Sequence, residues 1–401
     1  MTRIAKRSTM RSWPRWAESN PMKKLLLAVL LFGLTLAAFA VVSHRPSMPP
    51  ENTLSYELLQ PGPFEVATGT MELVDPSRFV AAPGDSSSTS ERRMPVHLWY
   101  PRSENHSPQP LLIYSHGFMS TGEGVAYLTE VLASQGYVVA APDFPITGRS
   151  RGEEANSRDV LNQPRDVALL IEALLARSQD ESDALYRRID GERIAAIGYS
   201  LGALNTLLLG FHPTLQEPRI KAVISLAGPT AVFTRKFLNT RAIPFMAIAA
   251  TEDAFVGYEA NFLSLRDKVD DAILVTFERG SHLGFAEEGK WVRWFDQPDS
   301  LACDLAMETI DKNRKSEEPW YDELGGIEEG YVQKVDPDVC ENEVSSAMNP
   351  LRQQQLTLMA VRSFLACQFE EDPTERARWC DYLSGAFARE NEEISVGRAA
   401  R

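Results

Sequence analysis

The sequence predicts an α/β protein with a doubly wound, mainly parallel sheet. Three observations lead to this fold class. Short, continuous apolar runs bounded by turn residues recur along the chain, as expected for strands that are covered on both faces. Segments with helical apolar spacing lie in most of the gaps between these runs. The composition, with 44% hydrophobic and 24% charged residues in a chain of 401, is that of a globular protein able to bury a large core.

The first segment of the chain is basic and is followed by an apolar run. Residues 25–42 are almost wholly apolar, come directly after Lys23-Lys24, and contain Ala38-Phe39-Ala40 near their end. This layout is typical of a secretory signal peptide cleaved after Ala40. If translation starts at Met22, the signal peptide begins with a compact basic segment, Met22-Lys23-Lys24. A retained membrane anchor over residues 25–42 is the alternative. We therefore predict residues 1–43 as a signal peptide or anchor and the protein as exported, either periplasmic or secreted.

The elements follow in order after this segment. Residues 44–92 are rich in Pro and Ser, and the run 84–90 predicts an exposed loop, so we expect an extension with little regular structure there. Residues 93–401 should form the α/β domain. The expected strands are 96–100, 111–115, 137–141, 193–199, 222–226, 245–249 and 273–277. The expected helices are 125–134, 165–177, 201–210 and 350–368, the last of them closing the chain after an insertion at 287–349.

Charge and cysteine content limit the partners. A formal net charge of −14 argues against nucleic acid and against an anionic membrane surface. All four cysteines lie near the C-terminus, at Cys303, Cys340, Cys367 and Cys380, without the short spacing of a metal site. In an oxidising compartment they predict disulfides, with three pairing schemes open, and free buried thiols are the alternative.

A strand-to-helix turn carries the candidate nucleophile. The sequence Gly198-Tyr199-Ser200-Leu201-Gly202 follows an apolar run and precedes a helical one. This context matches the G-x-S-x-G elbow, in which a strained serine presents its Oγ at the carboxyl edge of the sheet. Gly198 and Gly202 leave room for the strand and the helix to close around Ser200. We therefore predict Ser200 as the nucleophile of an acyl transfer.

A serine nucleophile needs a histidine base and an acid that orients it. His282 follows the last expected strand and comes after Ser200 in the chain, which is the order such sites use. No Asp or Glu lies between residues 221 and 251, so the acid is Asp253 or its neighbour Glu252. We choose Asp253 and keep Glu252 as the alternative. Below the pKa of His282, ordinarily about 6.5, the rate should fall because the base is protonated.

The transition state of acyl transfer also needs two N–H donors for its oxyanion. The backbone N–H of Leu201, directly after the nucleophile, is the first. The loop after strand 111–115 reads Ser115-His116-Gly117-Phe118, and the backbone N–H of Phe118 is the expected second donor. Gly117 would permit the tight turn, and His116 would support the loop.

In this order the motifs resemble the α/β-hydrolase superfamily, and more narrowly its platelet-activating-factor acetylhydrolase and dienelactone-hydrolase-like group. The resemblance implies a serine esterase or lipase-like activity on acyl esters, without metal or organic cofactor, with Ser200, Asp253 and His282 as its triad. Dienelactone hydrolases have a cysteine where Ser200 stands, and animal acetylhydrolases place their acid after an earlier strand, so only the reaction class is carried over. The matching segments are 75–78, 98–101, 115–118, 136–139, 142–143, 165–166, 198–202 and His282.

The sequence leaves two points open. The aromatic side chains of the insertion could cap an acyl pocket or could pack against the core. They are Trp291, Trp294, Phe295, Trp320 and Tyr321. The whole protein could also be a non-catalytic binding protein of the same fold, or a peptidase or thioesterase that uses the same triad.

Overall fold

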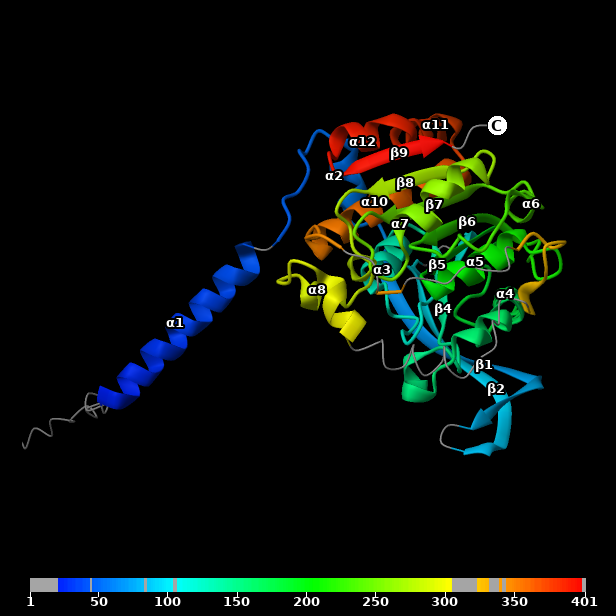
Figure 1. Cartoon of the computed structure of the whole chain (residues 1–401), viewed down its shortest axis with the longest axis horizontal. Coiled ribbons are helices and arrows are strands. Elements are labelled where there is room, and N and C mark those ends of the chain that lie inside the picture. Colours follow the sequence, from blue (N-terminus) through cyan, green and yellow to red (C-terminus); the bar gives the residue numbers. More distant parts are fainter. Residues whose placement is uncertain are drawn as a thin grey trace, which may run out of the picture. The chain divides into compact units, whose positions relative to one another are not determined.

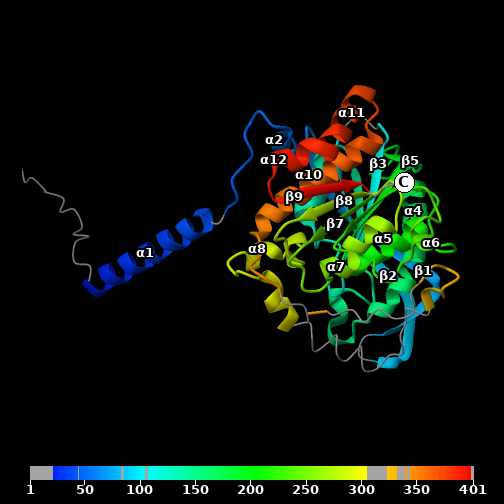
Figure 2. The ribbon, with the colours of Figure 1, turned by 45° about the horizontal axis from the view of Figure 1, so that its top comes forward.

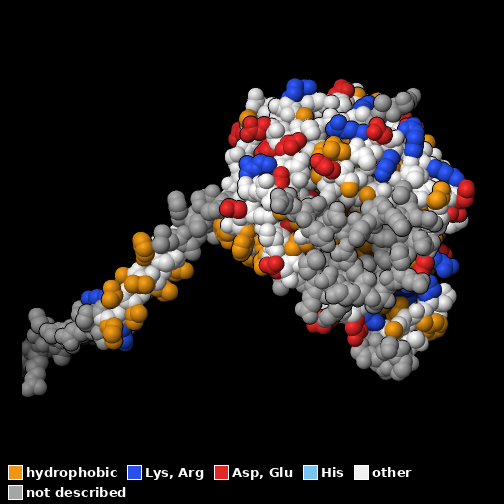
Figure 3. All heavy atoms as spheres, viewed as in Figure 1, with side chains coloured by type: hydrophobic (Ala, Val, Ile, Leu, Met, Phe, Trp, Pro, Cys, Tyr) orange, Lys and Arg blue, Asp and Glu red, His pale blue; other side chains and the backbone are white. Residues whose placement is uncertain are grey.

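The computed structural model describes residues 21–43, 45–82, 85–103, 107–304, 323–331, 339–340 and 344–398. The chain divides into two units, Met1–Arg45 and Pro46–Arg401. The first holds helix α1 (Pro21–Ser43), and Figure 3 shows exposed hydrophobic side chains between Met22 and Leu34. Across the described residues, no helix has the length and apolarity needed to cross a membrane.

The second unit is built on one sheet that contains nine strands in the described residues (Figure 1). Their order is β1-β2-β4-β3-β5-β6-β7-β8-β9. Strands β3 to β8 are parallel to one another, whereas β1, β2 and β9 join the two edges antiparallel. The bounds are β1 (Glu65–Ala82), β2 (Asp85–Arg102), β3 (Gln109–Ser115), β4 (Val138–Pro142), β5 (Ile189–Tyr199), β6 (Ile220–Leu226), β7 (Phe245–Ala250), β8 (Ile273–Phe277) and β9 (Ile394–Arg398).

Helices cover both faces of the sheet, as two views of the ribbon show (Figures 1 and 2). In β3, Leu111 and Ile113 pack into the core on one face, and Leu112 and Tyr114 into the core on the other. The first core contains α4 (Gln163–Arg177), α5 (Leu201–Phe211) and α6 (Arg235–Leu238). The second contains α2 (Leu54–Leu59), α3 (Ala126–Ser134), α10 (Pro350–Phe369) and α12 (Phe387–Glu390). The doubly wound, mainly parallel fold class is confirmed.

The two ends of the second unit differ from the sequence prediction. Residues 44–92 carry more structure than expected, because β1 and β2 form a long antiparallel hairpin that includes most of the Ser-rich run 84–90. In this run Asp85, Thr89 and Ser90 pair with β1, and backbone pairing of this kind does not depend on apolar side chains. The helix at 350–368 is not the last element either. The short helices α11 (Pro373–Asp381) and α12 follow it, and β9 then pairs with β8.

The cysteines pair as Cys303–Cys340 and Cys367–Cys380. The second disulfide joins α10 to α11, while the first joins two parts of the insertion. In the insertion, the structure describes α8 (Gly289–Val292) and a short helical segment over residues 298–304. Helix α7 (Tyr258–Asn261) comes before the insertion and precedes β8. Trp320 and Tyr321 lie outside the described residues.

Candidate active site

The turn between β5 and α5 forces an unusual backbone on Ser200. Its φ and ψ are 54° and −118°, a positive φ that a residue with a Cβ rarely adopts. The flanking glycines make the turn possible. A Cβ on Gly198 would lie 2.0 Å from the carbonyl oxygen of Gly202, and one on Gly202 would lie 2.0 Å from that of Ser115. Strand, helix and the neighbouring β3 loop therefore close around the serine only because both positions lack a side chain.

Three side chains from three different loops meet at this turn. The Ser200 hydroxyl lies 2.9 Å from Nε2 of His282, and Nδ1 of His282 lies 2.8 Å from Oδ2 of Asp253. Since the carboxylate can only accept, Nδ1 carries the proton and Nε2 is left to accept from the serine. The other oxygen of Asp253 accepts the backbone N–H groups of Phe255 and Val256, at 2.9 and 2.8 Å. The structure thus brings together the three residues chosen from the sequence.

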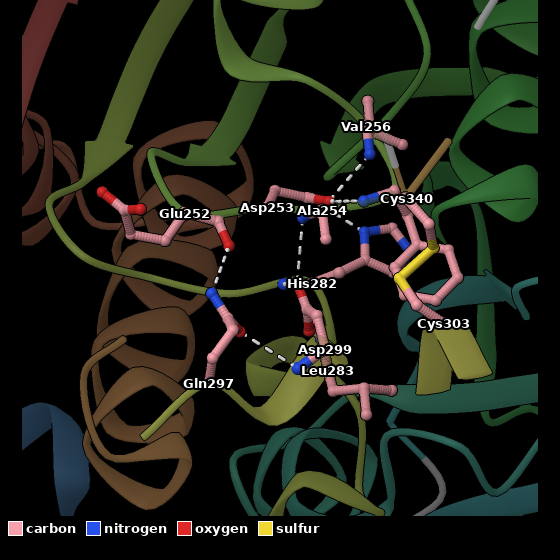
Figure 4. Close-up of a disulfide and its surroundings, with 11 residues drawn as sticks. Glu252, Asp253, Ala254, Val256, His282, Leu283, Gln297, Asp299, Cys303 and Cys340 are labelled. Atoms are coloured by element: carbon pink, nitrogen blue, oxygen red, sulfur yellow. Dashed lines mark hydrogen bonds and ion pairs between the residues drawn. A yellow bond between two sulfur atoms is a disulfide. The ribbon is translucent and has the colours of Figure 1, made fainter. Parts of the chain in front are cut away.

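The alternative acid points elsewhere. The carboxylate of Glu252 accepts the backbone N–H of Ser345 at 2.6 Å, and Figure 4 shows its side chain directed away from His282. Asp253 is buried, whereas Glu252 is only half-buried. The structure therefore favours Asp253 over Glu252 as the partner of His282.

The charge state of His282 depends on opposing effects. Burial disfavours the imidazolium and lowers its pKa, but the charge and hydrogen bond of Asp253, together with the charge of Asp299, outweigh burial and raise the pKa above its ordinary 6.5. Two aromatic rings enclose the imidazole. Phe255 stacks on it with ring centroids 4.9 Å apart, and the Tyr199 hydroxyl donates to the carbonyl oxygen of His282 at 3.1 Å.

The loop after β3 lies against the nucleophile. A Cβ on Gly117 would lie 3.3 Å from Cβ of Ser200, so the glycine allows this close approach. His116 fixes the loop from within the core, because Nδ1–H donates to the Gly117 carbonyl at 2.7 Å and Nε2 accepts the N–H of Phe144 at 3.0 Å. Burial lowers the pKa of His116, which keeps this imidazole neutral.

Two backbone donors remain beside Ser200. Within the part of the chain that the structure describes, neither the N–H of Phe118 nor that of Leu201 donates a hydrogen bond. Leu201 is also the first residue of α5, so the positive end of that helix dipole lies at the turn. These are the two N–H groups predicted from the sequence as donors to an oxyanion.

The part of the chain that carries this arrangement is similar to known proteins. Residues 95–292 match a family described as PET hydrolase-like. Cutinase est2 from Thermobifida alba is 33% identical over 157 residues, 39% of this chain and 45% of that protein. Cutinase cut1 from Thermobifida fusca is 31% identical over 247 residues, 60% and 66% of the two chains. Esterase YjfP from Escherichia coli is 30% identical over 141 residues, 34% and 51%. The chain thus spans about half to two thirds of the length of these relatives.

Together with the sheet order, this match decides the superfamily. This chain is an α/β-hydrolase. Residues 95–292, which match the PET hydrolase-like family, include Ser200, Asp253 and His282. The narrower resemblance to the acetylhydrolase and dienelactone-hydrolase-like group stays a prediction, because the matches named above are PET hydrolase-like proteins, cutinases and an esterase.

One residue of the site in this α/β-hydrolase was not foreseen. Asp299 lies in the insertion and its side chain is fully buried beside the triad loops, where it accepts the backbone N–H groups of Ala254, His282 and Leu283. No local motif marks it. From the sequence alone, an aspartate between Trp294 and Cys303 cannot be told from an ordinary surface residue. Only the path of the insertion, which returns to the acid and histidine loops, gives Asp299 its place.

Three of the aromatic residues in the insertion do not pack into the core, whereas Tyr331 does. Trp291, Trp294 and Phe295 have exposed fractions of 71%, 43% and 54%. Arg293 stacks over the ring of Trp294 at 4.0 Å, and Lys290 lies 5.4 Å from the ring of Trp291. Of the two alternatives, ordinary core packing is therefore wrong for these three side chains.

Proposed function

We propose that this α/β-hydrolase is an exported serine hydrolase that cleaves carboxylic esters of small or lipid-like molecules through an acyl-serine intermediate. The observation that carries the proposal is the hydrogen-bond chain from Ser200 through His282 to Asp253. The names of the relatives, PET hydrolase-like, cutinase and esterase, share ester hydrolysis, and this shared part is what we extend to the chain.

The proposed reaction has two halves. Oγ of Ser200 attacks the ester carbonyl while Nε2 of His282 takes the hydroxyl proton, and the N–H groups of Phe118 and Leu201 receive the oxyanion. The C–O bond to the alcohol then breaks, and His282 returns the proton to the leaving oxygen. Water attacks the acyl-serine in the second half, giving its proton to His282. That intermediate collapses as the bond between the acyl carbon and Oγ breaks and His282 returns the proton to Oγ, which releases the acid and restores Ser200; Asp253 keeps the imidazole oriented throughout.

Export is the second part of the proposal. The basic start and apolar run of residues 22–42 have the layout of a cleavable signal. The two disulfides suit an oxidising compartment, since such bonds are rare in the cytosol. A small-molecule ester is the expected partner, and the acidic net charge of −14 is unfavourable for nucleic acid.

Covalent labelling tests the proposed activity. The full chain, purified with its disulfides intact, is treated with a fluorophosphonate probe, and its intact mass is compared with that of Ser200→Ala. One adduct on the wild type and none on the variant, together with hydrolysis of p-nitrophenyl butyrate by the wild type alone, would support the proposal. A folded wild type that neither labels nor hydrolyses esters would contradict it and favour a binding protein. A Ser200→Ala variant that still labels would show that Ser200 is not the nucleophile.

A further inference from the structure

The insertion returns to the triad through a single buried carboxylate. Oδ2 of Asp299 accepts the N–H of His282 at 2.7 Å and that of Ala254 at 3.1 Å, and Oδ1 accepts the N–H of Leu283 at 2.8 Å. Ala254 follows Asp253, so one side chain holds the backbone of both the acid loop and the histidine loop. Figure 4 shows Asp299 lying between these two loops.

A covalent bond completes the connection. Cys303 follows Asp299 by one turn in the same short helical segment, residues 298–304, and its disulfide partner Cys340 donates its N–H to the carbonyl oxygen of Ala254 at 2.7 Å. The peptide groups of Ala254 are therefore held on one side by Asp299 and on the other by Cys340, as Figure 4 shows. Gln297 adds a third contact, because its Nε2 donates to the carbonyl oxygen of Glu252 at 3.2 Å.

The position of Asp299 is energetically costly. Within the described residues it has no Lys or Arg partner, and burial, together with the charge of Asp253, raises its pKa to about 6. The three N–H groups and the nearby imidazole favour its charged form and offset part of this cost. A buried carboxylate with a raised pKa beside a nucleophile and its base is more typical of a functional site than of a packed core.

We propose that Asp299 is a positioning residue of this hydrolase, which, fastened by the Cys303–Cys340 disulfide, fixes the Asp253 loop and the His282 loop relative to each other. The inference rests on the ester-hydrolase activity proposed above. Asp299 touches neither Ser200 nor the reacting atoms. It acts through the backbone that carries Asp253 and His282, and through its charge, which favours the protonated form of His282.

The test is Asp299→Asn in the full chain. An amide has one acceptor oxygen where the carboxylate has two, so at least one of the N–H groups of His282, Leu283 and Ala254 loses its partner. Because small displacements of catalytic groups are costly, we expect kcat/KM for p-nitrophenyl butyrate to fall about 100-fold. The acidic limb of the pH profile should also shift to lower pH. Within the described residues, the charged groups that face His282 are Asp253 and Asp299, and the protonated phenol of Tyr199 lies beside them. Asp299→Asn removes one of the two negative charges that raise the pKa of His282.

The matched control is Asp296→Asn, which removes an exposed carboxylate from the same segment and should leave the rate and the pH profile unchanged. If Asp299→Asn does not fold, the double variant Cys303→Ser/Cys340→Ser is compared with Cys367→Ser/Cys380→Ser. Loss of kcat/KM in the first pair and not in the second supports the proposal, and equal effects overturn it. Asp299→Asn that folds and keeps the wild-type rate and acidic limb overturns it as well.

An activity-independent readout separates this inference from the proposed function. The pKa of His282, followed by NMR, should fall in Asp299→Asn whether or not esters are hydrolysed, and an unchanged pKa would overturn the proposal. If the wild type neither labels nor hydrolyses, the proposed function fails. If the wild type is active and Asp299→Asn behaves like it, only the positioning role fails.

Discussion

At the scale of single residues, opposing effects set the pKa of His282: burial disfavours its charged form, and two carboxylates favour it. The carboxylates prevail and its pKa is raised above 6.5. In the proposed reaction the neutral imidazole is the base, so activity should rise with pH and reach half its maximum above pH ~6.5. The measurement is kcat/KM between pH ~5 and ~9, followed by titration of the released acid. A midpoint at or below pH ~6.5 would contradict this electrostatic assignment. Asp253→Asn removes the carboxylate that raises the pKa of His282 most, and this variant should be nearly inactive.

Gly202 allows a test of how closely the elbow and the β3 loop approach each other. In Gly202→Ala the new Cβ would lie 2.0 Å from the carbonyl oxygen of Ser115 and 2.6 Å from that of His116, both backbone atoms. The loop that carries Phe118 must move, so we expect a loss of at least ~2 kcal/mol in the free energy of unfolding and a large loss of kcat. The control is Gly69→Ala, whose Cβ would meet only Tyr100 at 3.9 Å. Urea unfolding that finds both variants equally stable would contradict the steric argument.

The residues of the site differ in how far the sequence alone predicts them, for a physical reason. Ser200 lies in a motif whose strain and glycines are local, and the absence of acids between residues 221 and 251 left few candidates for the partner of His282. Asp299 has no such local mark. Its role depends on contacts with Ala254 and His282 that arise only when the insertion folds back, and periodicity cannot express such contacts.

At the scale of elements, the central strands were predictable, whereas at the edges of the sheet only residues 96–100 of β2 were. Strands β3 to β8 are buried on both faces and appear as apolar runs, such as Ile194–Ile197 in β5. Strands β1, β2 and β9 lie at or near the edges and carry polar residues, including the Ser-rich start of β2. Edge strands have one solvated face or margin, so their sequences resemble loops.

The β1–β2 hairpin is fastened to the domain by a buried ion cluster. Arg92 on β2, 2% exposed, binds Asp159 at 2.7 Å and Asp166 of α4 at 2.6 Å. Arg78 of β1 also reaches Asp166, at 2.5 Å. Arg92→Ala leaves two buried carboxylates with fewer partners, and we expect a loss of ~3 to 5 kcal/mol in the free energy of unfolding.

The neighbouring arginine gives the matched control. Arg93 pairs with Glu72 and Glu91 on the same hairpin, but its side chain is 48% exposed. Water screens this cluster, so Arg93→Ala should leave the free energy of unfolding close to the wild-type value. Chemical denaturation of both variants measures the difference, and similar losses for Arg92→Ala and Arg93→Ala would show that the buried cluster does not hold the hairpin.

At the scale of the whole molecule, charge and covalent bonds are unevenly distributed along the chain. Residues 1–40 hold seven Lys and Arg and one Glu, so their removal takes the formal net charge from −14 to −20. Both disulfides lie in the C-terminal part of the second unit, Pro46–Arg401, which contains the whole sheet and the candidate site. An acidic unit with two disulfides, preceded by a basic and apolar segment, is consistent with a chain that folds after export.

Cleavage after Ala40 is the prediction that belongs to this scale. Small side chains at Ala38 and Ala40 fit the two positions that signal peptidases recognise, so expression of the full chain in a bacterial host should yield an exported protein that begins at Val41. Intact mass spectrometry under non-reducing conditions measures this directly, and failure of a thiol reagent to react would show that both disulfides have formed. The control Ala38→Leu/Ala40→Leu keeps the apolar run but blocks recognition, and should leave the precursor uncut. A wild-type chain that keeps its full mass and stays with the membrane fraction would contradict cleavage, and would identify residues 25–42 as an anchor instead.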